Sequence, residues 1–397
     1  MSKNTEVDTI GSIFDISKGN KLSVVIETSN ASRRLIGIDD LRNDNQIKYA
    51  DDVSGIEALP EDVLIAWDGA NAGTIGYGKN GLLGSTIARL RFIKKDKYYT
   101  PFIGAYLKSK FIYLRQTSIG ATIPHINRKA LEDIIVPKIS FDDQKRIAHL
   151  LGKVEGPIAQ RKQGLAQLDE LLKSVFLQMF GDQQFDKSEC SYVTLGSKAI
   201  IVSGVTKGKK YKDQKMYTVP YLRVANVQDG HLNLSEMKTI EVTEEEKARY
   251  QLHRGDLLLT EGGDLDKLGR GTLWNNEISG CIHQNHIFRV RLVDDSINPV
   301  FLSALVSSKY GKAYFLRSAK KTTGIASINS TQLKRFPLFL PSLSQQKKFA
   351  TIFEKVEIVK IQYQQNLLEL EKLYNVLSQK AFAGDLDLSR MGVVTNL

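Results

Sequence analysis

Cysteine is scarce and long apolar runs are missing, which excludes two broad classes of protein. Only Cys190 and Cys281 occur among 397 residues, too few for the disulfide framework of a small secreted protein. The stretch from Met1 to Ile10 is polar and lacks the apolar segment of a signal peptide. No apolar run approaches the roughly 20 residues that a membrane-spanning helix needs. We therefore expect a reduced, cytoplasmic protein.

Complete catalytic motifs are missing as well. The nearest match to the adenine methyltransferase motif, residues 298–301 (Asn-Pro-Val-Phe), has a single proline where the motif has two. Residues 73–80 nearly spell a phosphate-binding loop, but Asn80 replaces the Ser or Thr that would bind magnesium, which favours a glycine-rich turn. Asp256 and Glu261 lack the lysine of a nuclease site, and Asp256 is better interpreted as part of a turn. We expect no catalytic residue in this chain.

A metal site is not expected either. Cys281, His283 and His286 are a chemically reasonable set of zinc ligands. However, the sequence has no second cluster at metal-ligand spacing, which favours structural or base-contacting roles for these residues.

The positive charge indicates a polyanionic partner. Lysine and arginine number 55 against 44 acidic residues, which gives a net charge of +11 and a pI near 9.3. Such an excess favours nucleic acid, through contacts to phosphates. The length predicts two or three domains, and 42% hydrophobic with 25% charged residues is typical of a folded globular chain.

The sequence repeats itself at an offset of 202 residues. The segment from Ile126 to Phe180 recurs with few gaps, and weaker similarity extends into the segments before it. The pairs at this offset are Ile126-Asn127 with Ile328-Asn329, Gln144-Lys145 with Gln346-Lys347, and residues 153–155 with 355–357. The weaker matches, at other offsets, are 9–12 with 194–197, 61–65 with 255–259, and 89–91 with 289–291. Each half therefore consists of a divergent domain followed by a better matched helical segment.

The helical segments carry apolar stripes at heptad spacing. The stripes are in register at the same offset, and we expect them to pair with each other as an antiparallel coiled coil; their members are Leu165, Leu168, Leu172 and Val175, and Leu367, Leu370, Tyr374 and Leu377. Pro157 predicts a break, with a short helix from about Asp142 and a long one to about Met179. The second region has no proline there and can run straight through.

The preceding domains are expected to be α+β. Segments with β-branched and apolar character predict strands, and two longer patches predict helices. The expected strands are 62–67, 87–93, 221–227, 256–260 and 287–292, and the expected helices are 102–114 and 299–316.

The order of these motifs resembles the specificity subunits of type I restriction-modification systems. The resemblance covers the chain to about Leu386 and depends on residues 219–227, 255–259 and 284–286, and on 144–148 with their partners 346–350. It implies two target-recognition domains that read the two halves of a bipartite double-stranded DNA site, with the paired helices as a spacer. It further implies two methyltransferase subunits docked on the helices, which supply S-adenosylmethionine and methylate adenine, and translocase-nuclease restriction subunits. ATP and magnesium are then used by the partner subunits, and this chain binds no cofactor. In the first domain residues 84–86 (Gly-Ser-Thr) stand where the second has 283–286 (His-Gln-Asn-His), which puts equivalent base contacts in doubt.

These inferences divide the chain into a first target-recognition domain (1–140), helical spacer 1 (141–181), a second target-recognition domain (182–343), helical spacer 2 (344–385) and a C-terminal tail (386–397). Basic and polar residues in loops are the candidate DNA contacts. They are Lys18, Lys21, Arg33, Arg34, Asn71, Thr122 and His125 in the first domain, and Lys207, Lys209, Lys210, Lys212, Arg223, Lys267, Arg270, Lys320, Lys321 and Thr322 in the second. The alternatives are an enzyme with an unfamiliar site, and a DNA-binding regulator or scaffold that dimerises through its coiled coil.

Overall fold

The fold comes from a computed structural model of the full chain. The structure describes residues 8–389 except 45, 52–53, 95–96, 121, 182–190, 209–213, 264–267 and 323–324, and leaves the side chains of 191–192, 321–322 and 325 undescribed. The chain divides into two compact units. Unit 1 is Met1–Gln163 with Gln364–Leu397, and unit 2 is Gly164–Tyr363.

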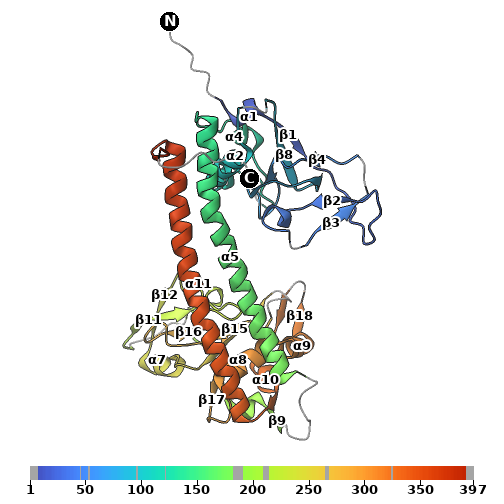
Figure 1. The fold of residues 1–397 in the computed structure, drawn as a ribbon. Coiled ribbons are helices and arrows are strands. Elements are labelled where there is room, and N and C mark those ends of the chain that lie inside the picture. Colours follow the sequence, from blue (N-terminus) through green and yellow to red (C-terminus); the bar gives the residue numbers. More distant parts are fainter. Residues whose placement is uncertain are drawn as a thin grey trace. The chain divides into compact units, whose positions relative to one another are not determined.

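Unit 1 contains two small sheets. The first has the antiparallel strands β1 (Phe14–Lys18), β8 (Ile87–Phe92), β5 (Val63–Ala66) and β6 (Ile75–Tyr77), in that order. The second has the order β3 (Lys48–Ala50), β2 (Arg33–Ile36), β7 (Gly81–Leu83) and β4 (Glu57–Ala58), in which β2 and β7 are parallel. The helical elements are α1 (Ile10–Ile13), η1 (Asp39–Leu41), α2 (Thr100–Ser109), α3 (Phe111–Gln116) and α4 (Arg128–Glu132). Helix α2 lies between the first sheet and the long helix that follows (Figure 1).

Unit 2 repeats this plan. Its first sheet has the order β10 (Ala199–Ser203), β17 (Ile287–Leu292), β13 (Leu257–Thr260) and β15 (Gly271–Leu273). Its second has β12 (Lys238–Val242), β11 (Tyr217–Leu222) and β16 (Ile282–His283), with β11 and β16 parallel. Unit 2 adds two further small sheets, made of β14 (Gly262–Gly263), β19 (Ile325–Ser327) and β18 (Lys320–Thr322), and of β20 (Pro337–Leu340) and β9 (Ser191–Thr194). The helical elements are α6 (Leu195–Lys198), η2 (Val224–Asn226), α7 (Glu244–Tyr250), α8 (Pro299–Ser307), α9 (Lys309–Ser318) and α10 (Ser330–Lys334).

The expected α+β class is therefore confirmed for both units, and most expected elements are present within a few residues. The strand expected at 221–227 is misplaced, because β11 ends at Leu222. The buried Asn226 side chain accepts a hydrogen bond from the Arg223 backbone amide at 2.8 Å, which turns the chain into η2. The near phosphate-binding motif 73–80 forms β6 and a turn, as the glycine-rich interpretation expected.

Buried ion pairs hold the first sheet of each unit at equivalent places. Arg91 binds the fully buried Asp62 through Nη2 at 2.6 Å and Nε at 2.9 Å. Arg291 binds Asp256 through both atoms at 2.7 Å. Asp256 also accepts the His253 backbone amide at 2.7 Å, so its role in a turn is confirmed.

Two long helices complete the fold: α5 (Phe141–Phe180) and α11 (Leu343–Ala383). The break expected at Pro157 is wrong, since α5 continues through it. Proline removes the hydrogen bond to the carbonyl four residues earlier, that of Lys153. Both Pro157 and Lys153 are exposed, so water can replace the lost donor and the helix continues.

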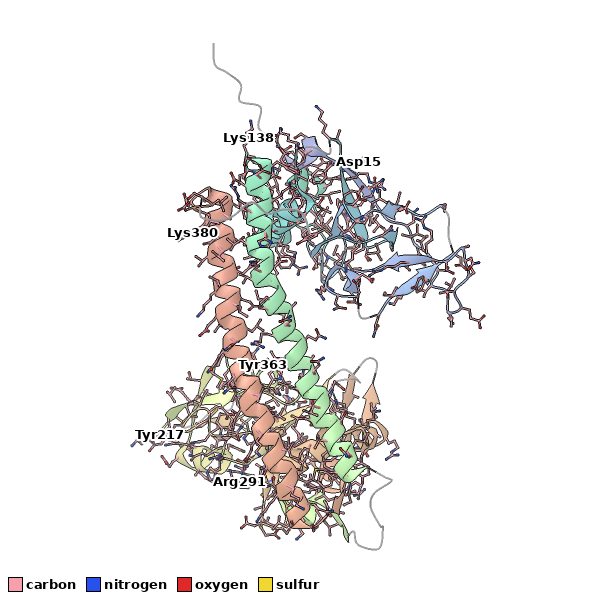
Figure 2. The ribbon with its side chains drawn as sticks, in the orientation of Figure 1. Asp15, Lys138, Tyr217, Arg291, Tyr363 and Lys380 are labelled. Atoms are coloured by element: carbon pink, nitrogen blue, oxygen red, sulfur yellow. The ribbon has the colours of Figure 1, made fainter. Side chains whose placement is uncertain are left out.

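The contacts between the helices differ from the expected pairing of the two stripes. In unit 1 the Tyr374 hydroxyl donates to Glu155 at 2.7 Å, and in unit 2 Lys360 pairs with Asp169 at 2.9 Å. Tyr363, labelled in Figure 2, faces Gly164, where an added β-carbon would lie 2.7 Å from its ring. Both stripes occupy the C-terminal halves of their helices, whereas an antiparallel pair brings a C-terminal half against an N-terminal half. Accordingly, the α5 stripe lies in unit 2 and the α11 stripe lies in unit 1.

The C-terminal end of each long helix packs into a domain core. Phe180 of α5 stacks edge-on against Phe301 of α8 with ring centroids 5.0 Å apart. Phe382 of α11 makes the same kind of contact with Phe102 of α2 at 5.6 Å. Among the described residues, no helix is both long and apolar enough to span a membrane.

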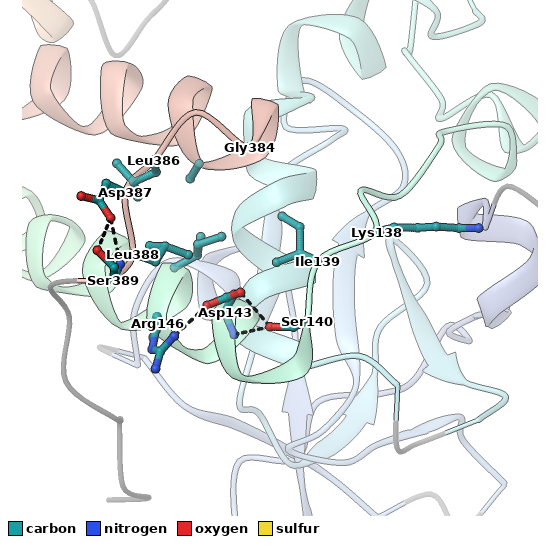
Figure 3. Close-up of a pocket in the computed structure, with 12 residues that line it drawn as sticks. Lys138, Ile139, Ser140, Asp143, Arg146, Gly384, Leu386, Asp387, Leu388 and Ser389 are labelled. Carbon is teal, nitrogen blue, oxygen red and sulfur yellow. Dashed lines mark hydrogen bonds and ion pairs between the residues drawn. The ribbon is translucent and has the colours of Figure 1, made fainter.

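A pocket of about 460 Å³ lies in unit 1 between the start of α5 and the chain after α11 (Figure 3). Its polar groups bind one another: Arg146 Nη1 donates to Asp143 at 2.9 Å, and the Ser140 hydroxyl donates to the same carboxylate at 2.8 Å. Leu386 and Leu388 pack against the core of unit 1. The pocket is therefore a packing gap between the start of α5 and the residues that follow α11.

Candidate nucleic-acid interface

Two candidate side chains of unit 1, Lys18 and His125, lie beside one carboxylate at one end of the first sheet. Lys18 is the last residue of β1, and its Nζ lies 2.6 Å from the Asp68 carboxylate, just after β5. His125 Nδ1 lies 2.6 Å from the other oxygen of Asp68. Burial acts to raise the pKa of Asp68, but the hydrogen bonds from Lys18 and His125 hold it below its ordinary value. We call Lys18, Asp68 and His125 the first corner.

Backbone hydrogen bonds gather the neighbouring loops around this corner. The Gly69 amide donates to the Pro124 carbonyl at 2.9 Å, which joins the loop carrying Asn71 to the loop carrying Thr122. The Asn71 side chain accepts from Arg42 Nη2 at 2.6 Å, and Thr122 is exposed. Lys21 is exposed three residues after β1.

Arg33 and Arg34 lie elsewhere, on β2 of the second sheet. Arg33 pairs with Glu57, and Arg34 pairs with Asp44 and, at 2.7 Å, with Asp40. Burial acts to lower the pKa of Arg34, but these two carboxylates raise it above its ordinary value. The arrangement binds both guanidinium groups into unit 1 and does not bring them to the first corner.

Unit 2 has a corresponding corner. Glu261 follows β13 directly, and its carboxylate lies 2.8 Å from Nδ1 of His286, which precedes β17. We call Glu261 and His286 the second corner. Beside it, β19 pairs with β14 and with β18, so that Ser327 lies opposite both Gly262 and Lys320.

The same backbone pairing occurs in unit 1, as isolated bridges and not as strands. His125 forms bridges with both Asp68 and Ile119, as Ser327 does with Gly262 and Lys320. The loop that carries Thr122 and His125 in unit 1 therefore corresponds to the segment that carries Lys320 and Ser327 in unit 2, although the side chains differ.

The other candidates of unit 2 are separate. Lys207 is exposed, and its Nζ lies 5.0 Å from the centre of the Tyr221 ring. Arg223 Nη2 donates to the Glu236 carbonyl at 3.0 Å, and Arg270 Nη1 donates to Gln228 at 3.0 Å. Lys209, Lys210, Lys212 and Lys267 lie outside the described residues, as do the side chains of Lys321 and Thr322.

Cys281, His283 and His286, which resemble a set of zinc ligands, have other partners. Burial raises the pKa of Cys281 to about 12 and lowers that of His283 to about 4. Both ring nitrogens of His283 face backbone carbonyls, those of Tyr250 at 3.1 Å and Val202 at 3.2 Å. Within the described part of the chain, no group of three or more potential ligands could hold a metal ion.

Sequence reasoning missed the carboxylates of both corners and the role of two glutamines. Gln144 and Gln346 are almost completely buried. Gln144 accepts the Tyr99 amide at 2.8 Å, and Gln346 accepts the Asn298 amide at 2.8 Å. The glutamine of each repeated Gln-Lys pair thus binds a long helix to its domain. The missed signal for the corners was an acidic residue within two positions of the end of a buried strand.

Two α+β units whose first sheets share one order of strands, each with polar loops at one end of that sheet, define an internally duplicated two-domain protein. Residues 2–170 and 189–372 match the family model described as the type I restriction modification DNA specificity domain, and the chain belongs to this family. The resemblance to specificity subunits is thereby confirmed.

Individual relatives agree. The chain is 26% identical over 395 residues to the MjaVIII specificity subunit of Methanocaldococcus jannaschii, covering 95% of this chain and 89% of that one. It is 22% identical to the EcoKI specificity subunit of Escherichia coli K12, covering 82% and 75%. Its fold resembles a crystal structure of a type I system S subunit from M. genitalium, with a TM-score of 0.54, 17% identity, and coverage of 96% and 98%. Type I specificity subunits are non-catalytic, and so is this chain.

Proposed function

We propose that this chain recognises a bipartite double-stranded DNA site, with one half read by each unit, and thereby directs partner subunits to it. The observation that carries the proposal is the double match to the specificity domain, 2–170 and 189–372, because each match falls largely on one α+β domain. A site of two halves needs two readers.

The proposed DNA contacts of unit 1 come from the loops around the first corner. Lys18 and Lys21 are suited to phosphates, and Asn71, Thr122 and His125 to base edges. In unit 2 we propose Lys320, beside the second corner, and the other residues that the sequence predicts as contacts: Lys207, Lys209, Lys210, Lys212, Lys267, Arg270, Lys321 and Thr322. Arg33, Arg34 and Arg223 are weaker candidates, because each pairs with a carboxylate of its own unit and none belongs to a corner.

We further propose two methyltransferase subunits and restriction subunits as partners. The repeated helical segments would offer two similar docking surfaces, which favours one specificity subunit for two methyltransferase subunits. The paired helices would then fix the spacing between the half-sites. The methyltransferase would supply S-adenosylmethionine and methylate adenine, and the restriction subunits would use ATP and magnesium, while this chain binds no cofactor.

Mapping of methylated adenine across the genome, with and without this gene, tests the proposal. The expected result is the loss of one bipartite motif, two short blocks separated by an unspecified gap. If every motif persists although the partner methyltransferase is active, the proposed function is wrong and a regulator or scaffold takes its place. A native mass that shows one methyltransferase subunit for each specificity subunit would contradict the proposed stoichiometry.

A further inference from the structure

Both units place a carboxylate–histidine pair at the end of the first sheet. Asp68 and His125 are joined at 2.6 Å in the first corner, and Glu261 and His286 at 2.8 Å in the second. In each pair the carboxylate holds Nδ1 of the imidazole, so the ring can contact another molecule through Nε2. The side chains of His125 and His286 are 45% and 58% exposed.

The two pairs are built from positions that do not correspond. The Glu261 backbone amide donates to the carbonyl of His286, just before β17, and the Trp67 amide donates in the same way to the carbonyl of Thr86, just before β8. By that match, the counterpart of Glu261 is Trp67. A shared ion pair left over from a common ancestral domain would use the same positions in both copies. Here the same chemistry arises at the same corner from different residues.

Carboxylates are electrostatically unfavourable on a surface that faces DNA phosphates. The chain carries a net charge of +11, and an exposed acidic group beside a DNA backbone is repelled. In the major groove, however, a carboxylate is the acceptor that suits the exocyclic amino group of cytosine, and adenine offers an amino group as well. The Glu261 carboxylate is 36% exposed, and Asp68, at 15%, is the more enclosed of the two.

We propose that the two corners are specificity-determining sites, in which Asp68 and Glu261 accept a hydrogen bond from the amino group of a cytosine or adenine in the major groove. The paired imidazole makes the adjoining contact through Nε2. In the first corner Lys18 partly offsets the charge of Asp68, and its ammonium is suited to a neighbouring phosphate. This inference rests on the proposed function, and it assigns one reading position to each half of the site.

The test uses the full chain assembled with its methyltransferase subunits and a pool of duplexes randomised in both half-sites. Methylated duplexes are sequenced for the wild type, Glu261→Gln and Asp68→Asn. Each amide variant keeps the size of the side chain but adds a donor, which opposes an amino group. We expect discrimination at one base pair of one half-site to fall by roughly 5- to 150-fold, in opposite halves for the two variants.

Glu241→Gln and Asp15→Asn serve as matched controls. Glu241 is an exposed residue of β12 in unit 2, and Asp15, labelled in Figure 2, is an exposed residue of β1 in unit 1. Both are expected to leave the motif unchanged. Glu261→Asp keeps the acceptor and should retain the preferred base with weaker discrimination.

Each other outcome has a distinct meaning. Unchanged base preference at every position in the corner variants overturns the inference. Equal loss in both half-sites, with the controls active, also overturns it, because the carboxylates then serve the fold. If the wild type itself selects no bipartite motif, the proposed function fails instead.

Discussion

Replacing the buried Gln346 with leucine should strongly destabilise unit 2. Its carbonyl oxygen accepts the Asn298 amide at 2.8 Å, and its amide nitrogen donates to the Pro341 carbonyl at 2.9 Å and the Ser296 carbonyl at 3.4 Å. Leucine has nearly the same volume but neither donor nor acceptor. The side chain is only 1% exposed, so water cannot readily take over these bonds.

The magnitude follows from the backbone groups left without a partner. Leaving a buried donor or acceptor unsatisfied costs about 1–3 kcal/mol. Counting the Asn298 amide and the Pro341 carbonyl, and neglecting the longer contact to Ser296, the expected loss is roughly 2–6 kcal/mol. This is a large part of the roughly 5–15 kcal/mol that stabilises a typical domain.

Urea unfolding of the full chain, combined with hydrogen exchange at the start of α8, measures this effect. Exchange of the Asn298 amide should accelerate together with the fall in unfolding free energy, because that amide loses its acceptor. Gln362→Leu is the matched control, an exposed glutamine on the same helix and in the same unit, and should change stability by less than about 0.5 kcal/mol. If Gln346→Leu behaves like this control, the reasoning about buried backbone groups is refuted.

Three further outcomes are expected. Pro157→Ala restores a helix donor at an exposed position and should raise the unfolding free energy by up to about 3 kcal/mol in urea titrations; a loss of stability would contradict the cost assigned to the missing donor. Arg291→Met leaves Asp256 buried without its ion pair and should cost about 3–5 kcal/mol, whereas the exposed Arg254→Met should change little, and equal effects would refute the pairing. The folded-state pKa of Asp68 is depressed, so its ion pairs stabilise unit 1 above the unfolded pKa of about 3.9 and this contribution is lost as the pH falls through the folded value. Thermal midpoints of the wild type and Asp68→Asn should therefore differ at pH 6 and approach each other as the pH is lowered below the unfolded pKa, and a constant gap would contradict this sign.

Much of the fold could be predicted because its signals are local. The buried strands around Val63 and Leu257 are apolar runs between turns, and the strands predicted there are confirmed. The repeat at an offset of 202 also located true structural equivalents. Asn127 and Asn329, for example, both cap the short helix that follows them.

The errors arose where a distant partner decides the local structure. The end of β11 depends on Asn226, whose side chain also donates to the carbonyls of Asn233 and Glu236. Heptad spacing shows that a helix has an apolar face but not which segment covers it. The corner pairs join Asp68 to His125, 57 positions apart, and Glu261 to His286, 25 apart, and neither spacing is a motif.

The comparison of the two copies changes what identity within the repeat means. Matching segments suggested a common docking surface, yet Gln144 and Gln346 match because each must satisfy the same buried backbone groups of its own domain. Identity at such positions therefore marks architecture, and only exposed matches such as Lys153 and Lys355 remain candidates for a shared partner. Difference at the corners has the opposite meaning. Under the proposed function, a protein that reads two unlike half-sites with one fold must vary the side chains at the corners and keep those that hold the sheet together.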